Sequence, residues 1–204
     1  MKKTLYVDTE TTGLNPQEHG LVQLAMIMDI DGIAVDIALF TIQPFPTDRV
    51  EVYWNDVRTI NVREAEGFKL PIVGLDTSDL ITRPTPFEAI DDIILFLDKY
   101  ISKFDKTDKA SISGYNIQYD IDFLSAFFKK VGNFYLGSYL YWQKLDVLHK
   151  IYQIAYKHNL VFENFKLATI CNYFAIPITE HDALSDITAT RNLWNLLEKR
   201  YGGV

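Results

Sequence analysis

The stretch TLYVDTETTGL, residues 4–14, joins an apolar run to two acids, Asp8 and Glu10. Residues 4–10 are predicted to form a buried β-strand, in which side chains two positions apart share a face. Asp8 and Glu10 are therefore expected to point the same way from the carboxyl end of that strand. Adjacent carboxylates repel each other, and a divalent cation, which prefers oxygen ligands, would offset the repulsion. A turn acid beside a solvent-facing acid explains this short motif equally well.

The segments that follow predict strands first and helices later. Residues 21–30 and 34–44 are expected to form an antiparallel hairpin around the turn DIDG at 29–32, and residues 109–116 a further short strand. Helical spacing of apolar residues predicts helices at 86–104, 119–132, 145–158, 164–176 and 182–201. Residues 45–85 have no clean period and are expected to be loop with a short helix. This order favours an α/β fold with a mixed sheet.

A second acid group lies in GYNIQYDIDFL, where Asp120 and Asp122 open a predicted helix. Acids in a first turn are ordinary, because they complement the helix dipole. On a helix, two residues at i and i+2 diverge by roughly 200°, so both cannot point inward. We expect Asp120 to face inward and Asp122 to be a surface acid.

A third group lies in EHDALSDITATRNL, where His181 and Asp186 are five residues apart. On one continuous helix the two would lie roughly 140° apart. His181 is therefore expected on a loop just ahead of the helix and Asp186 within its first turns, with Asp182 as the N-cap. The other histidines, His19, His149 and His158, are interpreted as structural or exposed.

Composition narrows the class of protein. The chain has 204 residues, 48% of them hydrophobic, which is enough for one sizeable core, and a single domain over residues 1–204 is the expectation. The net charge of −7 argues against a general nucleic-acid coating protein but is compatible with a metalloenzyme whose carboxylates bind cations. Cys171 is the only cysteine, which excludes a Cys-rich zinc site. No membrane span is recognisable, and a cytoplasmic protein is expected.

The three acid groups together resemble a known family. The motif DTETTG at 8–13, then NIQYD at 116–120, then His181 and Asp186 follow the order and rough spacing of the DEDDh 3′–5′ exonucleases. The chain looks like the group that contains the proofreading exonuclease subunit of bacterial replicative DNA polymerase, ribonuclease T and oligoribonuclease. The resemblance covers residues 4–44 and about 86–197, whereas 45–85 is an atypical, insert-like segment.

The resemblance implies a ribonuclease H-like fold, with a mixed central sheet and helices on both faces, and two Mg²⁺ or Mn²⁺ ions. By motif position, Asp8 would contact both metals, and Glu10 and Asp186 would hold the metal that carries the attacking water. Asp120 would support the second metal, and His181 would be the general base. Two such ions can stabilise both the attacking and the leaving oxygen of a phosphodiester, and a histidine that titrates near neutrality suits the proton transfer.

The resemblance also implies residues that bind substrate. The backbone after the first motif, at Thr11, Thr12 and Leu14, would contact the terminal nucleotide, with the Leu14 side chain as an apolar wedge against the bases. Phe123 could stack on a base, although a core role explains it at least as well. Asn116 is a further candidate, with fixing of its loop as the alternative.

The sequence thus predicts a metal-dependent exonuclease that releases nucleoside 5′-monophosphates from single-stranded or frayed 3′ ends, with DNA favoured over RNA. An RNA-trimming exonuclease is the alternative within the same class, because nothing in the sequence reports on the 2′-hydroxyl. A subunit that binds a polymerase is the alternative from a different class. An α/β binding domain with solvated acids would require three unrelated motifs to coincide.

Overall fold

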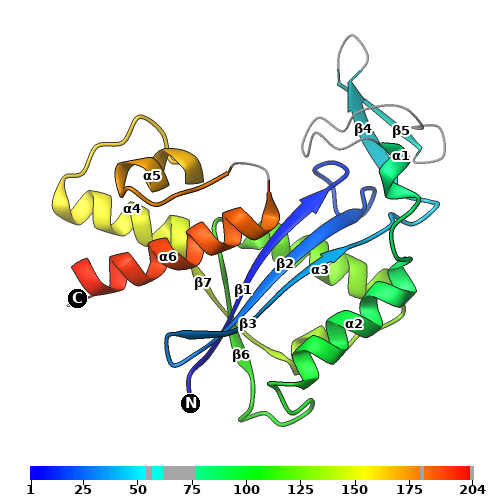
Figure 1. Ribbon diagram of the computed structural model, residues 1–204, viewed down its shortest axis with the longest axis horizontal. Helices are drawn as coiled ribbons and strands as arrows, with labels where there is room; N and C mark the ends of the chain where they lie inside the picture. The colour runs from blue at the N-terminus through cyan, green and yellow to red at the C-terminus, as the bar shows by residue number, and fades with distance from the viewer. Residues whose placement is uncertain (54–56, 62–76, 180–181, 203–204) are drawn as a thin grey trace.

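A five-stranded sheet forms the centre of the computed structural model, which describes residues 1–53, 57–61, 77–179 and 182–202 (Figure 1). The strand order is β3-β2-β1-β6-β7. The strands are β1 (Lys3–Thr11), β2 (Leu21–Ile30), β3 (Ile33–Thr41), β6 (Ala110–Gly114) and β7 (Leu140–Asp146). The β1–β2 and β2–β3 pairs are antiparallel, whereas β1–β6 and β6–β7 are parallel. The mixed sheet and the β2–β3 hairpin expected from the sequence are therefore confirmed.

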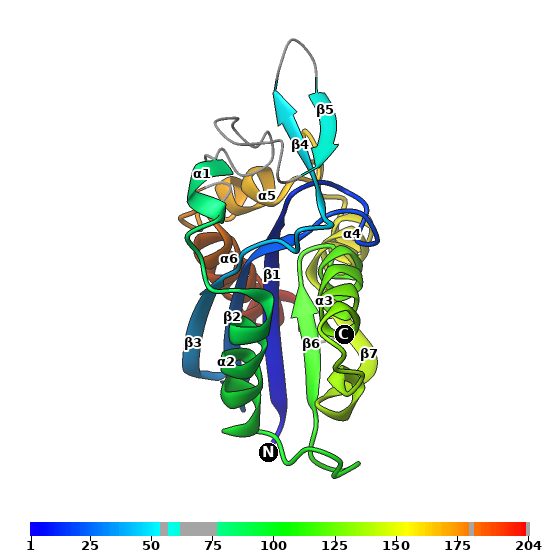
Figure 2. The same cartoon turned by 90° about the vertical axis from the view of Figure 1, so that its right-hand side faces the viewer.

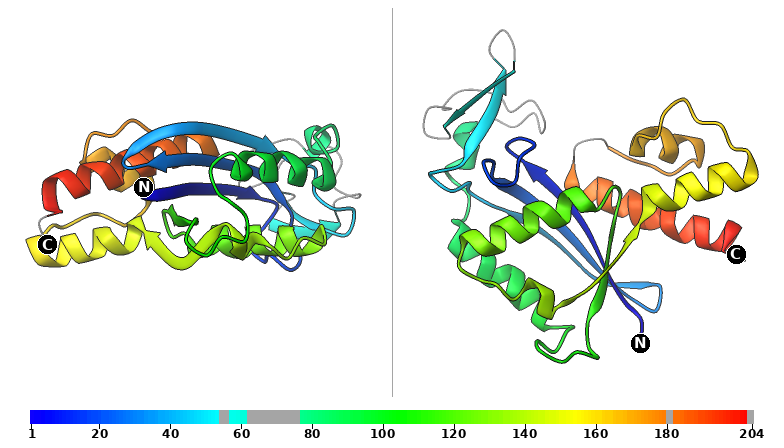
Figure 3. Two further views of the ribbon diagram at one scale, coloured as in Figure 1. Left: turned by 90° about the horizontal axis from the view of Figure 1, so that it is seen from below. Right: turned by 180° about the vertical axis from the view of Figure 1, so that it is seen from behind.

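Helices cover both faces of this sheet. The helices of the described residues are α1 (Thr77–Leu80), α2 (Pro86–Asp98), α3 (Gln118–Lys130), α4 (Val147–His158), α5 (Leu167–Tyr173) and α6 (Ala183–Tyr201), of which α2, α3 and α6 pack on the sheet. Viewed from behind, α3 lies across the strands (Figure 3), whereas α6 runs in front of them in Figure 1. Within the described residues, no helix combines the length and the apolar character needed to cross a membrane.

Alternation along β1 divides the core between the two faces. Leu5 and Val7 belong to the larger apolar cluster, which α2 and α3 cover. Tyr6, one position over, packs instead with Ala183 and Ile187 of α6. Asp8 and Glu10 continue the series of even-numbered residues, so the strand's own geometry turns both acids toward the α6 face.

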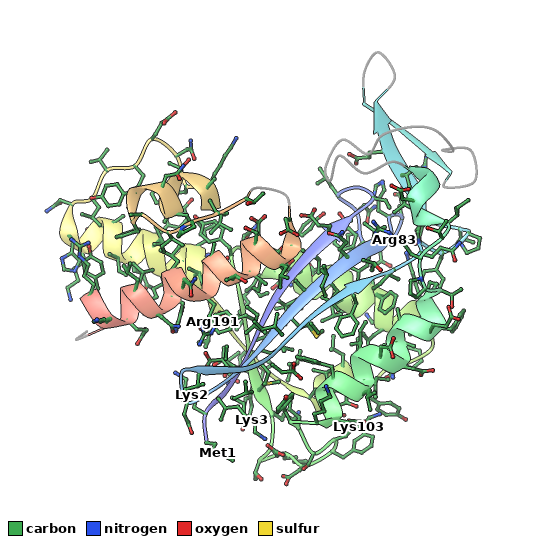
Figure 4. All side chains as sticks on the ribbon, viewed as in Figure 1. Met1, Lys2, Lys3, Arg83, Lys103 and Arg191 are labelled. Atoms are coloured by element: carbon green, nitrogen blue, oxygen red, sulfur yellow. The ribbon has the colours of Figure 1, made fainter. Side chains whose placement is uncertain are left out.

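The helix α6 is fixed to the sheet by a buried ion pair as well as by apolar contacts. Arg191 donates from Nε to the buried Asp29 carboxylate at 2.8 Å and from Nη2 to the Gly32 carbonyl at 2.9 Å, so it joins α6 to the β2–β3 turn (Figure 4). On its other side α6 packs with α4 and α5 around a separate apolar cluster that includes Ile151, Cys171 and Leu193.

Several expectations about local structure were wrong in part. Residues 45–85 were expected to be loop with a short helix; the short helix is present as α1, but part of the segment also forms a hairpin of β4 (Arg49–Tyr53) and β5 (Val57–Asn61), which projects beyond the sheet in Figure 1. The helix expected at 164–176 spans only Leu167–Tyr173. The helix expected at 86–104 ends at Asp98. The helix expected from residue 145 begins at Val147, because Leu145 and Asp146 close the edge strand β7.

Candidate active site

Three carboxylates meet at the carboxyl end of β1. Asp8, which is partly exposed, and Glu10, whose side chain is 6% exposed, come from the strand itself. Asp186 comes from the first turn of α6, which Ala183 and Ile187 hold against Tyr6. One oxygen from each of Asp8, Glu10 and Asp186 lies within 4.8 Å of the other two. Residues from opposite ends of the chain therefore form one group with the spacing of metal ligands.

Asp120 adds a fourth carboxylate from the first turn of α3. Its Oδ1 accepts two hydrogen bonds from Thr9, at 2.9 Å from the backbone N–H and 2.7 Å from the hydroxyl. The side chain is buried beside β1, whereas Asp122 is exposed and accepts a hydrogen bond from the Gln118 amide. The prediction that Asp120 faces inward and Asp122 faces solvent is confirmed.

Burial raises the pKa values of Asp8, Glu10 and Asp120, and neighbouring acids add to the rise at Asp8 and Glu10. Burial, followed by the negative charges of Asp120 and Glu10, holds the pKa of Asp8 well above its ordinary range. Burial and then the charge of Asp186 raise the pKa of Glu10 to about 8. Burial raises the pKa of Asp120 to about 7 against the two hydrogen bonds from Thr9, which favour its charged form.

This arrangement fits a divalent cation. Among the described residues, no lysine or arginine forms an ion pair with Asp8, Glu10 or Asp120. The described residues thus supply no cationic partner for these three acids, and protons or a bound metal ion would neutralise their charge. The carboxylate oxygens suit Mg²⁺ or Mn²⁺ better than zinc, which favours nitrogen and sulfur.

The loop after β1 is closed by its own hydroxyls. Thr11 Oγ1 lies 2.6 Å from the Tyr119 hydroxyl and donates to the Gly13 carbonyl at 2.7 Å. Thr12 Oγ1 donates to the Arg49 carbonyl at 2.6 Å. Both threonine side chains are buried, so they are committed to shaping the loop, whereas the Leu14 side chain is 67% exposed. Of the three predicted substrate contacts, Leu14 alone presents its side chain to solvent.

Two residues that support this loop were missed as site residues. Tyr119 donates its hydroxyl to the Gly13 carbonyl at 3.1 Å, in addition to its contact with Thr11. The buried His19 ring fills the space where a side chain at Gly13 would be, 2.3 Å from the position of a Cβ. His19 Nδ1 accepts a hydrogen bond from the Asn15 backbone at 3.0 Å, which agrees with its structural interpretation. In the sequence, the glycine at position 13, directly after two threonines, was the feature that could have indicated that another side chain packs closely against the backbone there.

The remaining predicted residues lie in different environments. Asn116 is exposed with a φ of 57°, and its backbone N–H donates to Asp146 at 3.2 Å. Asp146 is also the N-cap of α4. An aspartate directly before an apolar helical pattern is a typical N-cap, so the sequence could have predicted this role. Phe123 is 1% exposed and packs against the Tyr119 ring, so it presents no open face to a base and its core role is favoured. His181, the predicted general base, lies outside the described residues.

At the start of α6, the Asp182 side chain accepts a hydrogen bond from the Ser185 backbone at 3.2 Å. The predicted N-cap is therefore confirmed. The cap sets the position at which α6 begins, and so it fixes Asp186 in the first turn, beside β1.

Comparison with solved structures shows that the chain has a known fold. No protein-family model matches the chain, and no curated protein matches it. Among solved structures, it resembles E. coli Exonuclease I in complex with a 5cy-dT13 oligonucleotide, with a TM-score of 0.72 and 17% identity over 99% of this chain and 42% of that one. The zinc-bound form of the E. coli ExoI–ssDNA complex gives a TM-score of 0.73 and 17% identity over 100% of this chain and 42% of that one.

A third structure of Exonuclease I, described as suggesting how processivity is achieved, gives a TM-score of 0.71 and 16% identity, again over 99% and 42%. The chain thus spans less than half the length of the proteins whose structures it resembles. At this level of identity the likeness bears on the fold. The chain has the ribonuclease H-like fold, with a mixed sheet and helices on both faces, that its sequence predicts.

Proposed function

We propose that residues 1–204 form a single exonuclease domain that hydrolyses single-stranded or frayed DNA from the 3′ end and releases nucleoside 5′-monophosphates. The observation that carries the proposal is the convergence of Asp8, Glu10 and Asp186 within 4.8 Å, with Asp120 beside them. The fold shared with Exonuclease I, which has been solved with single-stranded oligonucleotides, supports a DNA strand as the substrate.

In this proposal the acids divide the work of holding two Mg²⁺ or Mn²⁺ ions. The negative charges of Asp120 and Glu10 both act on the Asp8 carboxylate, which suits Asp8 to contact both ions. Glu10 and Asp186 complete one site, and Asp120, with one oxygen already bound to Thr9, supports the other. Bound ions supply the positive charge that stabilises the attacking and leaving oxygens of the phosphodiester. His181 is proposed to accept the proton of the attacking water.

The loop after β1 is proposed to bind the terminal nucleotide. Its shape is set by the buried hydroxyls of Thr11 and Thr12, and the exposed Leu14 side chain is placed to contact the last base. Apolar contact with a base face does not depend on its identity, so this role suits an enzyme that degrades any sequence.

The test is cleavage of single strands labelled at the 3′ or 5′ end, DNA and RNA in parallel, with Mn²⁺ or Mg²⁺. We expect the 3′ label to leave first as a mononucleotide and Asp8→Asn to abolish its release. The matched control is Asp122→Asn, which removes an exposed acid two residues from Asp120 and should cut like the wild type. Release of the 5′ label first, or equal cleavage by Asp8→Asn, would refute the proposal.

The same assay addresses the finer alternatives. Faster cleavage of RNA would assign the domain to RNA trimming, because the sugar is the difference between the two substrates. A polymerase partner is a further prediction, tested by co-purification of a polymerase with the tagged chain. Retrieval of no polymerase under conditions that preserve nuclease activity would exclude that role.

A further inference from the structure

A recess lies away from the acid cluster, between α3 and the edge strand β7. Figure 2 shows β7 and α3 side by side at one edge of the molecule. The recess has a volume of about 500 Å³, and its apolar floor includes Ile112, Phe128 and Leu140. We call it the α3–β7 groove. It follows α3 from Ile121, the residue next to Asp120, to Lys129, along about 12 Å of helix.

Exposed aromatic rings stand along this groove. Trp142 of β7 lines it and is 88% exposed, and Phe134, which follows α3, lines it and is 74% exposed. Aromatic side chains of this size are ordinarily buried for most of their area. Scattered exposed rings need no explanation, but two rings on one recess present flat apolar faces to the same occupant.

The charged residues that line the groove are all cations. Lys106, Lys109 and Lys129 line it, and no aspartate or glutamate does so among the described residues. This is a local reversal in a chain of net charge −7. Of the acids beside the first two lysines, Asp108 pairs with Lys3, and Asp105, which accepts from the Thr107 backbone and hydroxyl, does not line the groove. The groove is therefore complementary to an anion that also carries flat apolar groups.

We propose that the α3–β7 groove binds single-stranded nucleic acid, at a position separate from the acid cluster. Bases would stack on Trp142 and Phe134, and phosphates would contact Lys106 and Lys129, as in grooves that combine aromatic platforms with positive charge. The choice of a strand over an acidic peptide rests on the proposed function, which supplies a strand as substrate. The groove would hold a part of the strand away from the 3′ end while that end occupies the acid cluster.

The first experiment measures binding without cleavage. Fluorescence anisotropy of a labelled dT20 strand is followed in EDTA, with Trp142→Ala combined with Lys129→Gln. We expect Kd to rise at least about tenfold, because one stacking contact and one phosphate contact are lost. The matched control is Tyr156→Ala with Lys157→Gln, which removes a ring that is 91% exposed and an exposed lysine from a different hollow, on α4. Its Kd should equal that of the wild type.

Salt dependence gives a second readout. When the logarithm of the binding constant for a single strand is plotted against the logarithm of the salt concentration, each phosphate contact contributes about 0.7 to the steepness of the slope. Lys106→Gln with Lys129→Gln should therefore make the slope shallower by about 1.4, whereas Lys157→Gln should not change it. Circular dichroism and thermal unfolding verify that each variant is folded. We expect these surface substitutions to leave the fold intact.

The outcomes separate the groove from the proposed catalysis. If the groove variants bind dT20 as the wild type does while Mn²⁺-dependent cleavage is present, the groove assignment is wrong and the exonuclease proposal stands. If they lose binding while the wild type cleaves nothing with Mn²⁺, the groove stands and the exonuclease proposal fails. If dT20 does not bind but a glutamate–tyrosine copolymer quenches tryptophan emission in the wild type and not in Trp142→Ala, the groove is a protein-docking site and the strand assignment is overturned.

Discussion

Substitution of Glu10 by glutamine is predicted to stabilise the metal-free protein at alkaline pH. The Glu10 carboxyl is buried beside other acids, which raises its pKa to about 8 in the folded protein, against 4.5 ordinarily. The folded state therefore holds this proton more tightly than the unfolded chain does. The resulting stabilisation is fully present below pH 4.5 and is lost as the pH rises toward 8. Glu10→Gln removes that titration, while its amide occupies nearly the same volume.

The size of the effect follows from the interval of pH. The interval from pH 5.5 to the pKa of about 8 is roughly 2.5 pH units. Over each of these units the folded state keeps the Glu10 proton and the unfolded chain has lost it, so the unfolding free energy falls by about 1.4 kcal/mol per unit. Glu10 alone should therefore cost the wild type about 3 kcal/mol of unfolding free energy between pH 5.5 and 8.5. For a chain of this length, 1 kcal/mol corresponds to roughly 2–4 °C, so the wild-type Tm should fall by about 6–12 °C more than that of Glu10→Gln.

The assay is thermal unfolding in EDTA at both pH values, repeated with Mn²⁺. We expect Mn²⁺ to restore the wild-type Tm at pH 8.5 and to have little effect on Glu10→Gln, because binding to the folded state stabilises it only where the site is intact. Asp122→Asn, which changes an exposed acid, should behave as the wild type. Equal losses of Tm in wild type and Glu10→Gln, or a wild type that gains stability from pH 5.5 to 8.5 in EDTA, would refute the reasoning.

Arg191→Met should lower the unfolding free energy by about 3 kcal/mol in urea titrations, because it leaves the buried Asp29 carboxylate unpaired. Gly13→Ala should destabilise the loop after β1 by about 1–3 kcal/mol, since its Cβ would meet the His19 ring, and His19→Ala in the same chain should recover part of that loss. Tyr119→Phe should raise KM for a DNA strand more than it lowers kcat, because its hydroxyl holds the loop rather than the acids.

Each of these expectations has a result that contradicts it. An Arg191→Met protein as stable as the wild type would mean that the ion pair with Asp29 contributes nothing. A Gly13→Ala loss that His19→Ala leaves untouched would place the clash elsewhere. A Tyr119→Phe variant with unchanged KM and reduced kcat would assign the hydroxyl to the chemistry rather than to the loop.

The parts of the fold that the sequence predicted best are those in which one pattern dominates. The strand β2 is apolar along most of its length, and its bounds at Leu21 and Ile30 match the prediction. The pairing of Asp8 with Glu10 followed from the two-residue repeat of a strand, which tertiary contacts did not alter. Helical geometry predicted that Asp120 and Asp122 could not both face inward, but it did not decide which of them would; Asp120 is the buried one.

Edge strands were harder to predict, because one side of them faces solvent. The aromatic-rich stretch YLGSYLYWQ, residues 135–143, is typical of core or of an interface, and its composition alone favours core. Tyr139 is indeed buried, but Trp142 is exposed on β7, so the preferred interpretation was wrong for that residue. The β4–β5 hairpin was missed for a related reason: its strands form a two-stranded sheet outside the central one, so the apolar run of a central strand is absent.

The dispersal of the acids along the chain has a consequence for when the protein can act. Asp8 and Glu10 are made early, Asp120 much later, and Asp186 only with α6. A polypeptide still in synthesis therefore lacks a complete set of carboxylates until α6 has emerged and docked on β1. A cut in the backbone that releases α6 would dismantle the set again. An activity that depends on this cluster is thus restricted to molecules in which α6 is present and docked on β1.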